Sequence, residues 1–249
     1  MDINCDLGEG AGHDGGIMPL VTSANIACGA HAGDARTMRA AVELAGRHGT
    51  AVGAHPGFAD RAGFGRIEQD IGPRDAAALV ADQIRTLGKV AKGCGVHLHH
   101  VKLHGALYNQ ASRDPVLAEA VVSAILAVDP GLICYGLSGS VLLAAARAAG
   151  LRVAAEVFAD RSYQSDGSLT PRSKPGALIA DEETALAQVL RMAAEGRVRS
   201  TGGTDVPLSA DTVCLHGDGP DPVAFARRLR LGLGEAGIEV RAPCQDLRC

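Results

Sequence analysis

One strand-like run of the sequence gathers ionisable side chains on a single face. Successive side chains of an extended chain point to opposite faces, so Val101 and Leu103 share an apolar face. The other face carries His100, Lys102 and His104. A glycine follows and ends the run, which places His104 at a carboxyl end, where parallel α/β folds keep their active sites. Imidazole and ammonium groups in that place predict acid–base or electrostatic chemistry.

Four further apolar runs end in the same way, at ionisable residues beside a turn former. They cover residues 2–9, 52–56, 155–160 and 213–218. In the first run Asp2, Asn4 and Asp6 alternate with apolar residues, and in the third Glu156 belongs to the inward row. Burying one unpaired polar group costs about 1–3 kcal/mol. Five such runs therefore predict that these groups are used together.

Other polar residues leave their roles open. Asp160 shares its strand face with a second carboxylate, and a salt bridge with Arg161 or Arg172 competes with a catalytic role for it. His31 lies in a glycine-flanked turn after a strand, where backbone can approach a ligand closely, so we expect it to be functional. Among the remaining histidines, we expect His13 and His48 to be solvated, whereas His97 and His99 are equally compatible with structural and functional roles.

A metal site is an open alternative for the same residues. Imidazole and carboxylate groups suit zinc or another divalent ion, although the spacing does not imply one. The candidate ligands are Asp6, His31, His55, His104 and His216.

The sequence does not support a nucleotide-binding motif. Residues 10–15 formally match G-x-G-x-x-G after a strand, but Gly15, Gly16 and Pro19 stand where a helix should open. No G-x-x-x-x-G-K-[ST] sequence occurs. The chain therefore has no P-loop of its own.

The composition predicts one α/β domain spanning residues 1–249. Hydrophobic residues make up 47% with no tryptophan, which is typical of small side chains packed between helices and a parallel sheet. A net charge of −4 without a Lys/Arg cluster argues against nucleic acid as a partner. The start of the chain is unlike a secretory signal, and no apolar run approaches the roughly 20 residues of a membrane span. We expect a soluble, cytoplasmic protein with no membrane partner.

The seven cysteines include no C-x-x-C pair. This pattern predicts reduced thiols rather than a disulfide framework. Cys5, Cys28 and Cys214 lie in strand-like runs, and we expect them to be small apolar filler rather than nucleophiles.

Strand-like and helical segments alternate along the chain. Strands are expected near residues 2–6, 23–28, 51–55, 100–104, 132–136, 153–158 and 212–216, and helices near residues 34–48, 75–93, 115–128, 139–149, 182–196 and 221–236. Repeated βα units predict a parallel sheet. We favour a (β/α) barrel of seven or eight strands, whose closure could be irregular, because polar ends come from nearly every strand and a barrel brings them to one mouth. An open doubly wound sheet is the alternative.

Three details follow from this barrel. Residues 238–241 are the candidate for the eighth strand, if there is one. Asp34 and Asp75 are expected to cap the amino ends of helices. The long stretch of residues 160–181 exceeds a plain connection, so we expect it to cross the mouth of the barrel.

Six motifs, taken in order, resemble the family of the 5-oxoprolinase A subunit, also called the LamB/YcsF or lactam-utilisation family. They lie at residues 4–9, 23–34, 53–56, 101–109, 156–161 and 216–218. Three positions depart from the family pattern, with Ala30 in place of phenylalanine and with Ala35 and Leu103 in place of proline. The loop between Glu9 and Met18 is unusually short. The ionisable positions are kept, whereas the fit of the substrate and the shape of the mouth are expected to differ.

The resemblance implies a deacetylase-like barrel that opens the lactam 5-oxo-L-proline to L-glutamate. It also implies ATP as co-substrate and the B and C subunits of 5-oxoprolinase as partners, without identifying which of the three binds ATP. One general acid or base supplies about 10²–10⁴-fold, short of the about 10⁶-fold or more that is typical of enzymes. Phosphorylation of the amide oxygen would turn it into a leaving group and leave the ring carbon electrophilic.

The resemblance also suggests roles for the polar residues. The catalytic candidates are Asp6, Lys102, His104 and Glu156. The substrate-binding candidates are Asn4, Glu9, Asn25, His31, His55, Asn109, Arg161, His216 and Asp218. We expect Asp6 or Glu156 to activate water and Lys102 and His104 to stabilise developing anionic oxygens. The imidazoles of His31, His55 and His216 would hold the substrate carboxylate or move protons.

Three alternatives stay open at this point. Imidazoles around Lys102 could lower its pKa, and it would then act as an acid. The chain could be a metal-dependent amidase or deacetylase that acts alone without ATP. It could also be a non-catalytic subunit that binds 5-oxoproline while its partners perform the chemistry.

Overall fold

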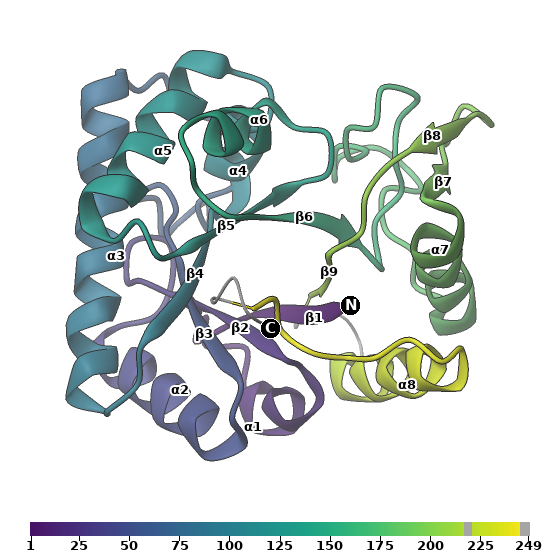
Figure 1. The fold of residues 1–249 in the computed structure, drawn as a ribbon, viewed down its shortest axis with the longest axis horizontal. Coiled ribbons are helices and arrows are strands. Elements are labelled where there is room, and N and C mark those ends of the chain that lie inside the picture. Colours follow the sequence, from purple (N-terminus) through teal and green to yellow (C-terminus); the bar gives the residue numbers. More distant parts are fainter. Residues whose placement is uncertain (217–220, 245–249) are drawn as a thin grey trace.

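Seven parallel strands close into a barrel in the computed structural model, which describes residues 1–216 and 221–244 (Figure 1). In order around the barrel they are β1 (Asp2–Leu7), β2 (Ser23–Ala27), β3 (Ala51–His55), β4 (Leu98–Lys102), β5 (Ile133–Leu137), β6 (Val153–Phe158) and β9 (Thr212–Leu215). The last strand pairs with both β6 and β1, which closes the ring. The barrel prediction is confirmed, and the open doubly wound sheet is excluded.

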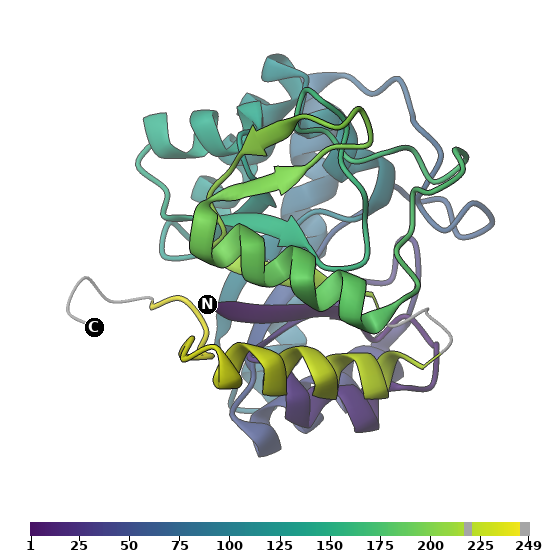
Figure 2. The same ribbon diagram turned by 90° about the vertical axis from the view of Figure 1, so that its right-hand side faces the viewer.

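Helices lie around the outside of the barrel (Figure 1). They are α1 (Asp14–Ile17), the 3₁₀ turn η1 (Met18–Leu20), α2 (Ala35–His48), α3 (Pro73–Gly93), α4 (Gly105–Ala111), α5 (Pro115–Val128), α6 (Val141–Ala148), α7 (Glu182–Glu195) and α8 (Pro222–Glu235). The last two lie side by side on one flank (Figure 2). The carboxylate of Asp34 caps α2, as expected. Asp75 does not cap α3, because the helix begins earlier, at Pro73, which is well suited to a first turn.

The structure differs from the expectation in two additional strands and in one expected strand that does not form. Strands β7 (Arg197–Arg199) and β8 (Asp205–Pro207) form an antiparallel hairpin outside the barrel. Residues 238–241 form no strand, so the expected eighth strand is wrong. The physical reason is the closure itself. Because β9 already pairs with β1, the barrel offers no free edge for an eighth strand.

The interior of the barrel is polar, and the apolar core lies outside it. Ile3 and Leu7 of β1 are buried in the main hydrophobic cluster. The alternate residue Asp2 is buried among hydroxyl groups, where its carboxylate accepts hydrogen bonds from Ser23 and Tyr135 at 2.8 and 3.1 Å. Alternate side chains of a strand therefore point outward to the helices and inward to the barrel interior.

The cysteine expectation holds for most of the described thiols. Cys5, Cys28, Cys94, Cys134 and Cys214 are free. Cys244 is disulfide-bonded, so the expectation of reduced thiols is wrong for this residue. It is exposed in irregular backbone after the last helix, whereas the thiols of the barrel strands are buried, and an exposed sulfur is more open to oxidation.

None of the helices in residues 1–216 and 221–244 is both long enough and apolar enough to cross a membrane.

Candidate active site

Polar side chains from several strands meet in one cavity of about 880 Å³. Its wall includes the predicted site residues Asp6, Glu9, His55, Lys102, His104, Asn109, Arg161 and His216. Four others, Asn4, Asn25, His31 and Glu156, are buried in contact with these residues. Residues 161–173 supply a large further part of the wall, as expected for a segment that crosses the mouth. Asp218 lies outside the described residues.

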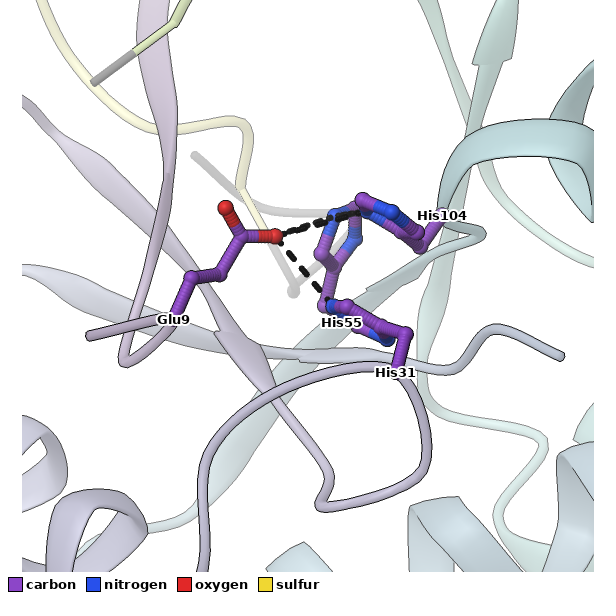
Figure 3. Close-up of side chains that lie close together, drawn as sticks. All are labelled: Glu9, His31, His55 and His104. Atoms are coloured by element: carbon purple, nitrogen blue, oxygen red, sulfur yellow. Dashed lines mark hydrogen bonds and ion pairs between the residues drawn. The ribbon is translucent and has the colours of Figure 1, made fainter. Parts of the chain in front are cut away.

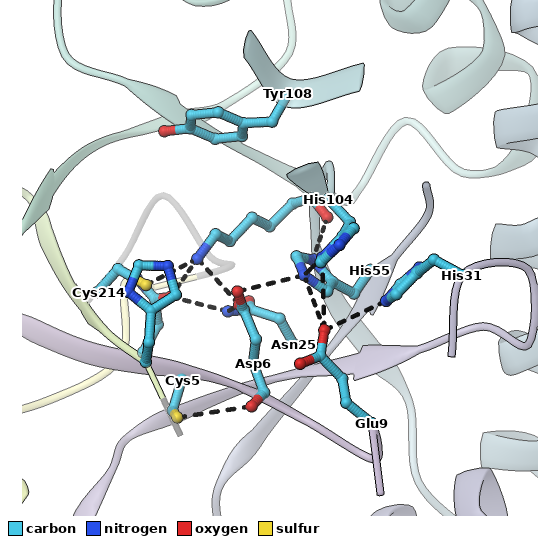
Figure 4. A network of polar contacts seen from close by, with 12 residues as sticks. Cys5, Asp6, Glu9, Asn25, His31, His55, His104, Tyr108 and Cys214 are labelled. Carbon is cyan, nitrogen blue, oxygen red and sulfur yellow. Dashed lines mark hydrogen bonds and ion pairs between the residues drawn. The ribbon is translucent and has the colours of Figure 1, made fainter. Parts of the chain in front are cut away.

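The strand register explains why these side chains converge. Asp6 lies opposite Asn25 in the pairing of β1 with β2, and Asn4 lies opposite Cys214 in the pairing of β1 with β9. Their shared alternation turns all four side chains to the same interior. Lys102 ends β4 and enters the same interior from across the barrel, so its ammonium group reaches Asp6 of β1. Figure 4 shows Asp6, Asn25 and Cys214 within this network.

Lys102 is the hub of the network. Its ammonium nitrogen lies 2.8 Å from Oε1 of Glu156 and 3.0 Å from Oδ1 of Asp6. It also lies 3.0 Å from Oδ1 of Asn4 and from Sγ of Cys214. Burial alone would lower the pKa of Lys102, but the facing carboxylate of Asp6 is the main influence that holds it well above its usual value. The alternative in which imidazoles lower this pKa is wrong, because carboxylates and not imidazoles are the nearest charges.

Asp6 is the matching anion. Burial would raise its pKa, but the charges of His55 and Lys102 hold it well below the usual value. Its two oxygens are shared between these neighbours, with Oδ1 toward Lys102 at 3.0 Å and Oδ2 toward His55 at 3.3 Å. Asp6 is therefore ionised at neutral pH and exposed to the cavity.

Two asparagine amides brace this ion pair. Asn4 donates from Nδ2 to Glu156 at 2.9 Å. Asn25 donates to Oδ1 of Asn4 at 2.7 Å and to Asp6 at 2.8 Å, and its own oxygen faces His100 at 2.8 Å. Both amides are fully buried and occupied by internal hydrogen bonds. Their position favours a supporting role, and substrate contact by either residue stays a prediction.

Three histidines and Glu9 form a cluster (Figure 3). It adjoins Asp6, whose Oδ2 faces His55 at 3.3 Å. The rings of His31 and His104 stack with centroids 3.7 Å apart. Oε1 of Glu9 lies 3.2 Å from Nε2 of His31 and 3.4 Å from Nδ1 of His104. His55 completes the group, with Nε2 3.0 Å from Nδ1 of His104. The four candidate ligand atoms all lie within 4.8 Å of one another.

Backbone carbonyls fix the orientation of two of these rings. His55 donates from Nδ1 to the carbonyl of Lys102 at 2.8 Å, and His104 donates from Nε2 to the carbonyl of Phe64 at 2.8 Å. A carbonyl can only accept, so the opposite nitrogen of each ring faces into the cluster. Burial lowers the pKa of His104 to about 2. Burial would lower the pKa of His55 too, but Asp6 raises it. His55 is therefore the donor in the hydrogen bond between the two rings.

The same arrangement fits a divalent cation. Ring nitrogens oriented by carbonyl groups are the usual setting of histidine ligands, and a carboxylate completes the donor set. Nδ1 of His31 is buried without a hydrogen-bond partner, and burial lowers the pKa of this ring. Glu9, His31, His55 and His104 could therefore bind a metal in place of the proton on His55.

His216 lines the cavity and forms a second acid–base pair with Asp160 behind it. Nδ1 of His216 lies 2.7 Å from Oδ2 of Asp160, and its ring stacks on Phe158. Burial would raise the pKa of Asp160, but His216 is the main influence that lowers it. The carboxylate thus pairs with a histidine, rather than with either arginine considered from the sequence.

Sequence reasoning missed two members of the network. Tyr108 donates to Oε2 of Glu156 at 2.7 Å. Cys214, expected to be filler, contacts Lys102, although burial raises the pKa of its thiol well above the usual value. The alternation that identified His216 also placed Cys214 on the inward row, so a signal for it was present. Tyr108 lies on α4, a short helix that no periodicity revealed.

The chain is similar to known proteins over almost its whole length. The A subunit of 5-oxoprolinase from Shouchella clausii is 56% identical over 97% of this chain and 98% of that protein. A crystal structure of a lactam utilization protein from Thermus thermophilus superposes with a TM-score of 0.91 at 48% identity, over 98% of this chain and 99% of that one.

A more distant likeness concerns the fold alone. A mutant CE4 family pseudoenzyme with restored enzymatic activity matches with a TM-score of 0.51 at 10% identity, over 96% of this chain and 64% of that one. The barrel fold expected from the sequence is thus found in a CE4 family protein as well. The LamB/YcsF family matches residues 1–248, and with these relatives it shows that the chain belongs to the LamB/YcsF family.

Proposed function

We propose that this chain opens the lactam ring of 5-oxo-L-proline to give L-glutamate, as the A subunit of an ATP-dependent 5-oxoprolinase that works with B and C subunits. The names of close relatives supply the substrate and the place in the complex. The observation that carries the proposal is an ionised Asp6, held at the cavity wall between Lys102 and His55. Amide hydrolysis needs such a base together with a proton donor for the leaving nitrogen.

Asp6 is better placed than Glu156 to activate water. Glu156 is fully buried, and Lys102, Asn4 and Tyr108 occupy its oxygens. Asp6 faces the cavity, where water and substrate can reach it. The low pKa of Asp6 makes it a weak base. The water that Asp6 activates can therefore attack only a carbonyl that is already activated. Phosphorylation of the amide oxygen at the expense of ATP would supply that activation.

The other groups complete a balanced ring opening. Water adds its oxygen to the ring carbonyl carbon, and its proton passes to Asp6. The bond from that carbon to the ring nitrogen breaks, and the nitrogen leaves with a proton from His216, whose ring Asp160 orients. The acyl phosphate that remains is hydrolysed by a second water, which releases L-glutamate and inorganic phosphate. Lys102 keeps its own proton throughout, because its pKa is high. Its role is to stabilise negative charge at the site.

The cluster of Glu9, His31, His55 and His104 favours a second candidate, a metal-dependent amidase that needs no ATP. A bound divalent cation would polarise a carbonyl and lower the pKa of a bound water. His55 and His104 would bind it through the nitrogens that face the cluster, because backbone carbonyls hold their other nitrogens. Glu9 would balance part of its charge.

Glutamate release separates these functions. Wild-type protein is assayed with 5-oxo-L-proline, with and without ATP and with and without the B and C subunits, alongside Asp6→Asn. An amide at this position cannot accept a proton from water, so activity should fall by at least about 10²-fold. The control Asp82→Asn changes an exposed carboxylate on α3 and should keep full activity. Glutamate release by the chain alone, without ATP but with added metal, would favour the amidase. Full activity of Asp6→Asn would refute the assigned base.

A further inference from the structure

A buried arginine lines the cavity, and its charge is not matched by the described part of the chain. Arg161 follows β6 and is 7% exposed. Its Nη2 donates to the backbone carbonyl of Thr170 at 2.7 Å, whereas Nε is buried without any hydrogen-bond partner. Within residues 1–216 and 221–244, no carboxylate lies within ion-pair distance of this guanidinium. The part of the side chain that remains accessible belongs to the cavity wall.

The neighbours of Arg161 do not neutralise its charge. The adjacent carboxylate of Asp160 is paired with His216 at 2.7 Å. Arg172, which lines the same cavity, adds a second positive charge. An uncompensated buried charge is strongly destabilising, and a native protein seldom keeps one unless a ligand compensates it. The unmatched guanidinium therefore marks the place of an anion.

The opposite polarity of the histidine cluster strengthens this assignment. Glu9 and Asp6 bring two carboxylates to that part of the wall. A substrate carboxylate would meet repulsion there. The cavity thus has an acidic, proton-transferring part and a cationic part, and a ligand that carries an anionic group has only one favourable orientation.

We propose that Arg161 is the receptor for the carboxylate of the lactam substrate and that the site selects anionic over neutral lactams. The inference rests on the proposed function and deepens it. It assigns the carboxylate to Arg161 instead of to the histidines, and it leaves His31 and His55 to the chemistry around Asp6. A guanidinium matches a planar carboxylate better than an ammonium group does.

Calorimetric titration of the full chain tests the proposal. The ligands are 5-oxo-L-proline, neutral 2-pyrrolidinone and inorganic phosphate, and the variants are Arg161→Gln and Arg161→Lys. Loss of a hydrogen-bonded charge should weaken 5-oxo-L-proline about 10- to 100-fold in Arg161→Gln. Arg161→Lys should recover part of this loss, and 2-pyrrolidinone should bind all three proteins alike. Arg113→Gln is the matched control, because Arg113 lines the same cavity but is exposed and paired with Glu68.

Three outcomes would overturn the assignment. Unchanged binding of 5-oxo-L-proline to Arg161→Gln would do so. An equal loss for both lactams would indicate a structural role instead. A loss confined to inorganic phosphate would make Arg161 a receptor for a phosphoryl group. Failure of the proposed function would show in a different measurement: wild-type protein with ATP and its partner subunits would release no glutamate. The binding measurement does not depend on turnover.

Discussion

At the scale of single residues, one cation serves two carboxylates. Lys102 of β4 contacts Asp6 from β1 and Glu156 from β6, so its charge links three strands of the barrel wall. The pair of carboxylates keeps the lysine protonated, and the lysine in turn keeps Asp6 ionised. This mutual dependence makes the network stable only as a unit.

Replacement of Lys102 should remove both activity and stability. Lys102→Met leaves Asp6 and Glu156 buried without their cation, which should cost about 3–5 kcal/mol of unfolding free energy and abolish glutamate release. Urea denaturation and the glutamate assay measure the two effects. The double variant Lys102→Met/Glu156→Gln removes one unpaired charge and should regain stability without regaining activity. Activity in a folded double variant would show that Lys102 is dispensable for catalysis. Lys89→Met, at an exposed position of α3, is the matched control.

Asp2 should make stability fall as pH rises. Burial raises the pKa of this carboxyl, although Thr212 and other hydroxyl groups donate to it. A folded pKa above the unfolded value stabilises the protein fully below the unfolded pKa, and this contribution is lost as pH rises through the folded pKa. Asp2→Asn does not titrate. Its unfolding free energy relative to wild type should therefore increase as pH rises from the unfolded pKa of about 3.9 through the folded pKa, by about 1.4 kcal/mol for each unit by which the pKa is raised.

Urea titrations across this pH range measure the difference. Asp82→Asn changes an exposed carboxylate and should follow wild type at every pH. A constant difference between Asp2→Asn and wild type would show that Asp2 does not have a raised pKa.

Alternation along strands was enough to find the polar residues but not their partners. It placed Lys102, Glu156 and His216 on inward rows because side-chain direction is a local property. The pKa of Lys102 depends on which groups face it across the barrel. Asp6 and Glu156 are far from Lys102 in sequence, so the direction of its pKa shift could not be predicted from the pattern.

At the scale of elements, long periodic segments were predictable and short ones were not. The seven barrel strands and the helices α2, α3 and α5 follow from their periodicity. The helix α4 has 7 residues and the strand β7 has 3, too few to show a period. The expected strand at residues 238–241 failed because local sequence does not reveal that β9 and β1 already close the ring.

Gly53 in β3 leaves room for a histidine ring from the neighbouring strand β4, and its replacement should disturb the site. A Cβ at Gly53 would overlap the ring of His100, which is fully buried and faces Asn25 at 2.8 Å. Gly53→Ala should therefore cost about 1–3 kcal/mol of unfolding free energy and lower activity through Asn25 and Asp6. Gly88→Ala on α3 is the control, because its Cβ would meet Leu98 at an ordinary 3.5 Å. Equal thermal stability of the two variants would contradict this account of β3.

At the scale of the whole molecule, the barrel separates support from chemistry. Its outer face packs on helices, its interior carries buried polar networks, and its mouth holds the cavity between the histidine cluster and residues 161–173. The interior hydrogen bonds fix the groups at the mouth in advance, which limits the reorganisation needed during reaction. Sequence predicted the shared mouth, but not the division of the cavity into acidic and cationic parts, because that depends on loops without periodic structure.

The histidine cluster predicts that a divalent cation stabilises the whole protein with a defined pH dependence. Zinc or manganese at about 100 times the dissociation constant should add about 2.7 kcal/mol, seen as a rise in the thermal unfolding midpoint. Binding must displace the proton of His55, whose pKa is raised by Asp6 after the opposing effect of burial. The stabilisation should therefore grow as pH rises through the pKa of His55.

Glu9→Gln distinguishes this site from weaker metal binding elsewhere. The variant keeps the shape of the side chain and removes the anionic ligand 3.2 Å from His31, so most of the metal-dependent shift should disappear. His48→Gln alters an exposed histidine at the end of α2 and should leave the shift intact. A shift retained in Glu9→Gln, or one that shrinks as pH rises, would place the cation outside the cluster. In that case the proton on His55 is the native occupant, and the histidines act through hydrogen bonds alone.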